Sequence, residues 1–325
     1  MRQTKILRIL TVVLLLFILF GGAFMAGVWA QKSMGFGNIL RSLGLDYSAG
    51  DQELYQATVP LDEILAMEKV GLPDELIGKM SLFVMAGQSN MSGKGTLPEM
   101  QHVNYHIYVF GNDYRWRLAL EPIDSPFGQV DDVSKDLYAR YSPALSFATN
   151  LHAMEPDRII GLIPCAKGET SIMEWQQDYS DQSLYGSCLK RIHAAGLAGQ
   201  VDGIIFFQGE ADTVDPDMAP HLPLAMNDYA AMFERFIADM RADLGDPNLP
   251  VVYAKIGSNK NSEKYVNWAI IQQQQESVVL VCSAMITSDD LELRDEIHYT
   301  TSSYRIIGER FADAFHALLS NPSCN

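Results

Sequence analysis

The sequence has few cysteines, and it lacks the short motifs that bind a nucleotide or a metal ion. It contains four cysteines in 325 residues, and no two of them form a C-x-x-C pair. This spacing argues against a structural zinc site and against thioredoxin-type chemistry. The patterns H-E-x-x-H and G-x-x-x-x-G-K-[ST] and the EF-hand loop are also missing. We therefore expect no metal and no organic cofactor.

Basic residues are scarce as well. The chain has 24 Lys and Arg against 40 Asp and Glu, which gives a net charge of −16. Without Arg2, Lys5 and Arg8 the remainder holds 21 basic side chains against 40 acidic ones, a net charge of −19. Such a surface repels nucleic acid and anionic lipid headgroups, so we expect no nucleic-acid partner. No motif identifies a protein partner.

One segment near the start of the chain lacks charge altogether. Residues 9–30 contain no charged side chain and follow the three basic residues named above. This length spans a bilayer, and the flanking charges place the amino terminus inside and the rest of the chain outside. Alternatively, residues 1–30 form a signal peptide. Val28-Trp29-Ala30 would then be the cleavage motif, with the cut after Ala30. The apolar run continues past Gly21-Gly22, which favours an anchor. Either interpretation places the remaining domain outside the cytoplasm.

The rest of the chain divides into a segment of uncertain role, 31–79, and a larger domain, 80–325. The first reads as a stalk or an N-terminal extension. In the second, apolar runs alternate with helical patterns, which predicts a three-layer α/β/α fold of the flavodoxin-like type with a mainly parallel sheet of about five strands. The predicted strands are Leu82 to Ala86, Ile159 to Pro164, Gly203 to Gln208, Val251 to Ile256 and Val278 to Cys282. The predicted helices are Ala144 to Met154, Asp228 to Leu244 and Ser302 to Leu319.

The four cysteines, Cys165, Cys188, Cys282 and Cys324, fit an oxidising compartment. They allow three complete disulfide pairings, and the sequence does not choose among them. Cys165 and Cys282 lie in predicted apolar strands, where buried free thiols are the alternative to disulfides. Cys188 and Cys324 are expected to be more exposed.

Two separated segments carry residues suited to acyl transfer. Ser89 follows the apolar run 82–86 in a small polar turn, and ligands of parallel sheets bind beyond the carboxyl ends of the strands. Far downstream, Asp295 stands three residues before His298. A serine nucleophile needs an imidazole to take its proton and a carboxylate to orient that imidazole. The neighbouring acidic residues Asp289, Asp290, Glu292 and Glu296 are rivals for the role of Asp295.

The order of these blocks resembles the SGNH (GDSL-like) hydrolase superfamily. Within it, Gly87-Gln88-Ser89-Asn90-Met91 and Gln208-Gly209-Glu210 resemble the sialate O-acetylesterase and acetylxylan esterase branch, of the carbohydrate esterase family six type. The resemblance covers about residues 80–319. It implies a catalytic triad of Ser89, His298 and Asp295. Four blocks occur in the right order, namely 87–91, 162–172, 208–210 and 295–298, so the match is more specific than a lone G-x-S-x motif.

The same resemblance implies an oxyanion hole. Its donors would be the backbone N–H groups of Ser89 and Gly168 and the side-chain amide of Gln208, with Glu210 fixing the loop behind them. Many relatives carry a second glycine where this chain has Glu169, which puts the conformation, local charge and substrate fit of that loop in question. Gly93-Lys94-Gly95 reads as a short flexible loop beside the nucleophile.

These expectations together describe a membrane-anchored or secreted serine esterase that removes O-acetyl groups from saccharides. One alternative keeps the triad but uses another short-chain ester. A second is an inactive surface protein of the same fold that binds carbohydrate. The aromatic residues Tyr114, Trp116 and Trp175 fit either a sugar-binding cleft or core packing.

Overall fold

The computed structural model describes residues 72–224, 226–321 and 324. The predictions for residues 1–30 and for all but the end of 31–79 lie outside this part of the chain. No helix among the described residues is both long and apolar enough to cross a membrane. A short 3₁₀ helix, η1 (Asp74–Leu76), precedes the first strand.

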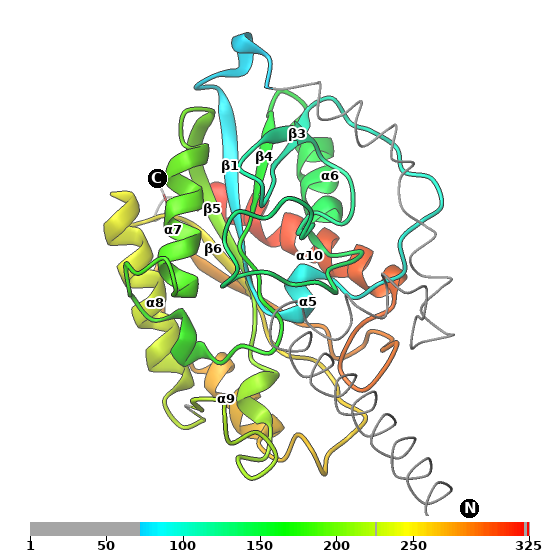
Figure 1. Ribbon diagram of the computed structural model, residues 1–325, viewed down its shortest axis with the longest axis vertical. Helices are drawn as coiled ribbons and strands as arrows, with labels where there is room; N and C mark the ends of the chain where they lie inside the picture. The colour runs from blue at the N-terminus through cyan, green and yellow to red at the C-terminus, as the bar shows by residue number, and fades with distance from the viewer. Residues whose placement is uncertain (1–71, 225, 322–323, 325) are drawn as a thin grey trace, which may run out of the picture. The chain divides into compact units, whose positions relative to one another are not determined.

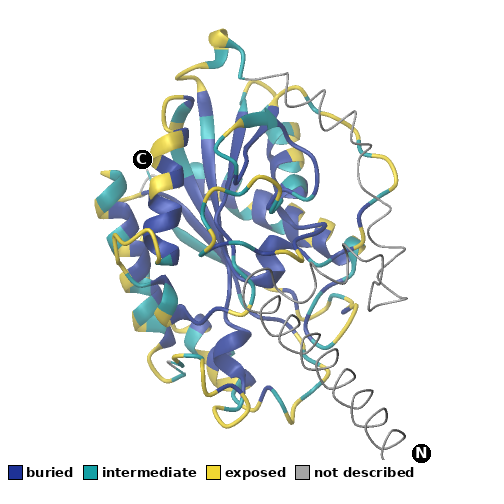
Figure 2. Ribbon diagram, viewed as in Figure 1, coloured by how far each residue is buried: buried dark blue, intermediate teal, exposed yellow. Residues whose placement is uncertain are grey.

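The centre of the described fold is a seven-stranded sheet in the order β3-β2-β4-β1-β5-β6-β7. All neighbouring strands run parallel except β2 and β3, which form an antiparallel pair at one edge. Strands β1, β4 and β5 occupy the middle; β1 and β4 are almost entirely buried, as are residues 203–207 of β5 (Figure 2). The strand bounds are β1 (Met80–Gly87), β2 (Ile107–Phe110), β3 (Trp116–Leu118), β4 (Ile160–Pro164), β5 (Gly199–Phe207), β6 (Val251–Ala254) and β7 (Ser283–Ile286).

Helices cover both faces of this sheet (Figure 1). Alternate residues of β1 point to opposite sides, so that Leu82 and Val84 pack with α7 and α8, whereas Phe83 and Met85 pack with α6 and α10. The helices are α5 (Ser89–Ser92), α6 (Ala144–Met154), α7 (Leu184–Ala195), α8 (Tyr229–Leu244), α9 (Trp268–Glu276) and α10 (Thr301–Leu319). Two further 3₁₀ helices are η2 (Ile172–Trp175) and η3 (Ala211–Thr213).

The prediction of an α/β fold with a mainly parallel sheet is confirmed, but the sheet is larger than expected. Four of the five predicted strands coincide with β1, β4, β5 and β6, and the three predicted helices coincide with α6, α8 and α10. The short strands β2 and β3, the second of which forms the edge of the sheet, were not predicted.

The fifth predicted strand was wrong. Residues 278–282 precede β7, which begins at Ser283, and Val279 and Val281 in this segment are 84% and 60% exposed. The apolar residues Val279 and Val281 are thus largely exposed before the strand begins, so hydrophobicity pointed to the wrong residues.

The cysteines form two disulfides, Cys165–Cys188 and Cys282–Cys324, and no cysteine among the described residues is free. Buried free thiols are therefore excluded for Cys165 and Cys282. The expectation that Cys188 is exposed was also wrong, because this residue faces the core from α7 and is 1% exposed.

Candidate active site

Four segments meet at the carboxyl-terminal edge of the central strands. The turn after β1 carries Ser89, the loop after β4 carries Gly168, and the loop after β5 carries Gln208. The loop between β7 and α10 brings His298 to the same place. Because β4, β1 and β5 are neighbours in a parallel arrangement, their carboxyl ends lie side by side.

Ser89 is presented by a turn that requires glycine. Gly87 ends β1 with a φ of +134°, and a Cβ atom at this position would lie 2.1 Å from the carbonyl oxygen of Phe207. The next residue, Gln88, donates its N–H to the same carbonyl at 2.8 Å. The chain then turns into α5, whose first residue is Ser89, 5% exposed. Only glycine permits this close approach of two strand ends.

The structure brings the three predicted triad residues into contact. The Nε2 atom of His298 lies 2.9 Å from the Oγ atom of Ser89. On the other side of the ring, Nδ1 lies 3.0 Å and 2.9 Å from the two carboxylate oxygens of Asp295. The Oδ1 atom of Asp295 also accepts the backbone N–H groups of Ile297 and His298, at 3.0 and 2.8 Å. These bonds hold the carboxylate and the imidazole in one orientation.

The charge state of Asp295 determines the tautomer of His298. Partial burial works to raise the pKa of Asp295, but hydrogen bonds from the ring and backbone of His298 outweigh it and hold this pKa well below its usual range. An ionised carboxylate only accepts hydrogen bonds, so Nδ1 carries the proton. Nε2 is then free to accept the hydroxyl proton of Ser89. Three of the rival acidic side chains have other partners: Asp289 pairs with Lys255, Asp290 with Arg310, and Glu296 with Asn261.

Two backbone N–H groups lie beside the Ser89 side chain. A Cβ atom built on Gly168 would be 3.6 Å from the Cβ of Ser89, so the loop after β4 runs directly alongside the serine. Among the described residues, neither the N–H of Ser89 nor that of Gly168 has an acceptor. Unpaired donors at this position suit a developing negative charge.

The amide of Gln208 is engaged elsewhere. Its Nε2 atom donates to the carbonyl oxygen of Thr170 at 2.7 Å and to Oδ2 of Asp212 at 2.6 Å, and the side chain is fully buried. Asp212 also accepts the Ser171 hydroxyl at 2.6 Å. Gln208 thus ties the loop after β5 to the Gly168 loop, and it donates to an oxyanion only by giving up one of these acceptors. Asp212, two residues after Glu210, was not predicted as a site residue.

Glu210 supports the turn that carries the nucleophile. Its Oε1 atom accepts the amide of Asn90 at 2.5 Å, and the same amide donates to the carbonyl oxygen of Ile297 at 3.1 Å. Tyr304 of α10 donates its hydroxyl to the other end of the Asn90 side chain at 2.6 Å. Burial raises the pKa of Glu210 despite the hydrogen bond from Asn90. Asn90 therefore connects the Ser89 turn to the His298 loop.

A buried ion pair lies behind Gly168. Lys94 pairs with Asp136 at 2.8 Å, and Oδ2 of Asp136 also accepts the Ser92 hydroxyl at 2.7 Å. This oxygen would be 3.0 Å from a Cβ on Gly168. Burial works to raise the pKa of Asp136, but Lys94 and the hydrogen bonds outweigh it and hold this pKa below its usual range. The expectation of a flexible Gly93-Lys94-Gly95 loop was wrong, because Lys94 anchors it.

Glu169 takes a backbone conformation that favours glycine. Its φ is +62°, in the left-handed region, which costs an ordinary residue about 1–2 kcal/mol. This observation explains in physical terms why a glycine suits the position. The side chain is exposed and lines a groove that also includes Gly168. Glu169, which stands where many relatives carry a glycine, therefore lies at the edge of the candidate site.

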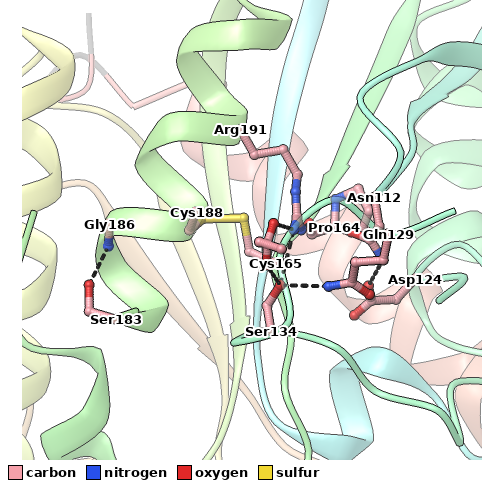
Figure 3. The surroundings of a disulfide bond; sticks show 11 residues. Asn112, Asp124, Gln129, Ser134, Pro164, Cys165, Ser183, Gly186, Cys188 and Arg191 are labelled. Atoms are coloured by element: carbon pink, nitrogen blue, oxygen red, sulfur yellow. Dashed lines mark hydrogen bonds and ion pairs between the residues drawn. A yellow bond between two sulfur atoms is a disulfide. The ribbon is translucent and has the colours of Figure 1, made fainter. Parts of the chain in front are cut away.

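The Gly168 loop is also covalently held at its start. The Cys165–Cys188 disulfide joins the residue after β4 to α7, with the two Cα atoms 5.4 Å apart (Figure 3). One turn further along α7, the fully buried Arg191 donates to the carbonyl oxygen of Pro164 and pairs with Asp131 at 2.8 Å. The disulfide and Arg191 fix the strand end from which the loop departs.

Trp175 does not line a sugar-binding cleft. It is fully buried and packs edge-on against Phe206 and Phe236. Trp116 is half-buried in β3 and contacts Phe110 in the neighbouring strand. Among the described residues, no three His, Cys, Asp or Glu side chains gather as a metal-binding group.

Fold and site together define an α/β protein with a mainly parallel sheet and a serine beyond the end of its central strand β1. The family model for carbohydrate esterases described as sialic acid-specific acetylesterase matches residues 79–317. The chain belongs to this family, as the resemblance of its motif blocks predicted. The members of the family are carbohydrate acetylesterases, and membership implies ester hydrolysis on an acetylated carbohydrate.

Individual relatives agree with this assignment. A probable carbohydrate esterase of Arabidopsis thaliana is 29% identical over 255 residues, which are 72% of this chain and 89% of that protein. The solved structure of the same plant protein has a TM-score of 0.61 at 26% identity and covers 74% of this chain and 98% of its own. A carbohydrate acetylesterase from Xanthomonas citri has a TM-score of 0.56 at 19% identity, over 73% of this chain and 56% of that one. At this identity the last likeness concerns the fold alone.

Proposed function

We propose that this protein is a serine hydrolase that removes O-acetyl groups from carbohydrates through an acyl-enzyme. The observation that carries the proposal is the continuous set of contacts from Asp295 through His298 to Ser89, with the reacting pair 2.9 Å apart. This distance lies within the range needed for proton transfer. Membership in the acetylesterase family supplies the substrate class.

The first half of the reaction forms an acetyl-enzyme. Ser89 Oγ attacks the carbonyl carbon of the ester while His298 Nε2 takes the hydroxyl proton, and Asp295 stabilises the imidazolium that forms. When the tetrahedral intermediate collapses, the bond to the sugar oxygen breaks and His298 returns the proton to this oxygen. The sugar leaves with a free hydroxyl, and the acetyl group stays on Ser89.

The second half regenerates the enzyme. His298 takes a proton from a water molecule, which attacks the acetyl carbonyl, and the proton then passes to Ser89 Oγ as acetate leaves. In both halves the negative charge develops on the former carbonyl oxygen. The N–H groups of Ser89 and Gly168 are the donors that we assign to it, and losing one such donor costs roughly 3 kcal/mol in comparable sites. We assign to Gln208 and Glu210 the positioning of these loops.

The same proposal includes a location outside the cytoplasm. The catalytic domain would be anchored through residues 9–30, or secreted after cleavage at Ala30. The two disulfides, Cys165–Cys188 and Cys282–Cys324, support this location because such bonds persist in oxidising compartments.

Acetate release by the purified full-length chain tests the proposed reaction. The substrates are acetylated xylan, O-acetylated sialic acid and an aryl acetate, with Ser89→Ala as the test variant and the exposed Ser277→Ala as the matched control. We expect release in the wild type and in Ser277→Ala and none above background in Ser89→Ala. A series of aryl esters with longer acyl chains then separates an acetylesterase from an esterase for other short-chain acids. A folded wild type that releases acetate from none of the substrates contradicts the proposal.

A further inference from the structure

The groove beside Gly168 contains a charged residue that the reaction does not use. The groove has a volume of about 560 Å³, and Gly168 and Glu169 both line it. Gly168 also lies against Ser89. The groove therefore begins beside the serine, where the sugar part of a bound ester would extend. A sugar attached to the reacting acetyl group therefore comes close to Glu169.

The Glu169 carboxylate is free to act on a ligand. It is exposed, and within the described part of the chain it makes neither a hydrogen bond nor an ion pair. The Lys264 ammonium is within electrostatic range of it, but Lys264 lies 3.7 Å from Glu296, which offsets its charge. The negative charge of Glu169 is therefore not neutralised by a neighbour.

Negative charges outnumber positive ones in the groove. The carboxylates of Glu174 and Asp178 line it together with Glu169, against the one ammonium of Lys167, which donates to the carbonyl oxygen of Lys135 at 2.7 Å. His221 is exposed on the groove, and no arginine is among the described residues that line it. Planar carboxylates are usually held by an arginine fork, so the groove lacks the group that best recognises one.

The backbone of Glu169 takes a conformation that a glycine would adopt more easily. A residue held at a φ of +62° is strained unless it is glycine, and such strain is concentrated at functional sites. A glycine would give the same loop without strain and without charge.

Resting on the proposed function, we propose that Glu169 selects the substrate by charge. It directs the site towards uncharged acetylated sugars and disfavours sugars that carry a carboxylate near the reacting ester. This preference points away from the free sialic acid of the family description, because a sialate is an anion.

A matched pair of substrates isolates the charge. O-acetylated sialic acid and its carboxyl methyl ester have the same reacting acetyl group and the same ring, and they differ at the carboxyl group, which is an anion in one and a neutral methyl ester in the other; release of acetate, not of methanol, is measured. We expect the wild type to show a kcat/KM on the order of tenfold higher for the methyl ester. The ratio should shrink towards one when salt is raised from about 0.01 M to about 1 M, because the Debye length falls from about 30 Å to about 3 Å.

Three substitutions separate charge from loop shape. Glu169→Gln and Glu169→Gly remove the charge and should bring the ratio close to one, mainly by raising kcat/KM for the free acid. Glu169→Asp keeps the charge and should keep the preference, since aspartate tolerates the left-handed region. A ratio near one in the wild type, or equal changes for both substrates in every variant, overturns the proposal.

Binding to the Ser89→Ala chain tests the inference independently of hydrolysis. Ligand-observed NMR with N-acetylneuraminate and its methyl ester should show tighter binding of the ester, and adding Glu169→Gln should remove this difference. If that preference is found while the wild-type chain releases no acetate, the proposed function fails and the role of Glu169 stands. Equal binding of the two compounds, or binding of neither, overturns the role of Glu169.

Discussion

The ammonium of Lys94 lies 2.8 Å from the carboxylate of Asp136, and this buried pair lies directly behind Gly168. Asp136 also accepts the hydroxyl of Ser92 in the helix that begins with Ser89. A single negative charge is thus placed beside the candidate oxyanion donor, with a positive charge next to it. The pair keeps the loop in place, and because it is neutral as a whole, Asp136 adds no net charge beside Gly168.

Removing only Lys94 should therefore lower both the stability and the activity of the protein. We expect Lys94→Met to lower the free energy of unfolding by about 3–5 kcal/mol, because it leaves a buried carboxylate without its counter-ion. The turnover of an aryl acetate should fall as well, since this carboxylate then repels the developing oxyanion. Thermal unfolding and steady-state kinetics measure the two effects.

The double variant Lys94→Met/Asp136→Asn provides the control. It removes both charges, so it should recover part of the stability and part of the kcat lost in Lys94→Met. A double variant that is no better than Lys94→Met in either measurement would show that the charge balance is unimportant.

Gln208 poses a separate question about the oxyanion hole. Both hydrogens of its amide have acceptors, Thr170 and Asp212, in the described structure. We expect Gln208→Ala to lower the thermal midpoint and to lower kcat together, because the two loops lose their connection. If Gln208 instead donated directly to the oxyanion, its loss would lower kcat by roughly 10²–10³-fold and leave the stability largely unchanged. A folded variant of unchanged stability with such a loss in kcat would assign Gln208 to the oxyanion.

The stability of the protein should decrease between pH 5 and pH 8. Asp124 is 3% exposed, and although Asn112 donates to one of its oxygens, burial raises its pKa from 3.8 to about 7. Burial likewise raises the pKa of Glu121 to about 8. A carboxyl group whose pKa is raised by folding binds its proton more tightly in the folded state. Its stabilising contribution is complete below the unfolded pKa and is lost as the pH rises through the folded one.

For Asp124 the contribution reaches about 4 kcal/mol, since a tenfold change in proton affinity corresponds to about 1.4 kcal/mol. Thermal unfolding at intervals across this pH range should show the decrease, and Asp124→Asn should make it shallower. The exposed Asp157→Asn serves as the control and should leave the profile unchanged. A wild-type profile that is flat or rises over this range contradicts the prediction.

Reduction of the disulfides should destabilise the domain. Cys165–Cys188 spans 23 residues, and closing a loop of this length contributes about 3 kcal/mol through the unfolded state. We expect Cys165→Ala/Cys188→Ala to lower the thermal midpoint and to reduce esterase activity, because the Gly168 loop begins at Cys165. A double variant with the stability of the wild type would contradict this account.

The sequence predicted those parts of the site that depend on chain order. Ser89 follows a uniformly apolar strand, and Asp295 precedes His298 at an interval that lets both side chains face one serine, so their contact could be expected. The central strands were recognised for the same reason, since strands buried on both faces are apolar throughout.

The remaining features depend on contacts that no local pattern records. Lys94 and Asp136 are 42 residues apart, and nothing near either of them indicates the pairing. The three hydrogen bonds of the Asn90 side chain join it to residues 120, 207 and 214 positions away. The strained φ of Glu169 was not predictable either, although the replacement of a glycine drew attention to the position.

The most direct test of the account is a rapid-quench experiment during turnover of an aryl acetate, followed by mass spectrometry of the digested protein. We predict an acetyl group on the peptide that contains Ser89, formed and lost at rates that match turnover, and no such adduct and no turnover in Ser89→Ala. Undiminished turnover in Ser89→Ala, or an acetyl group carried by a different residue, would contradict the assignment of Ser89 as the nucleophile.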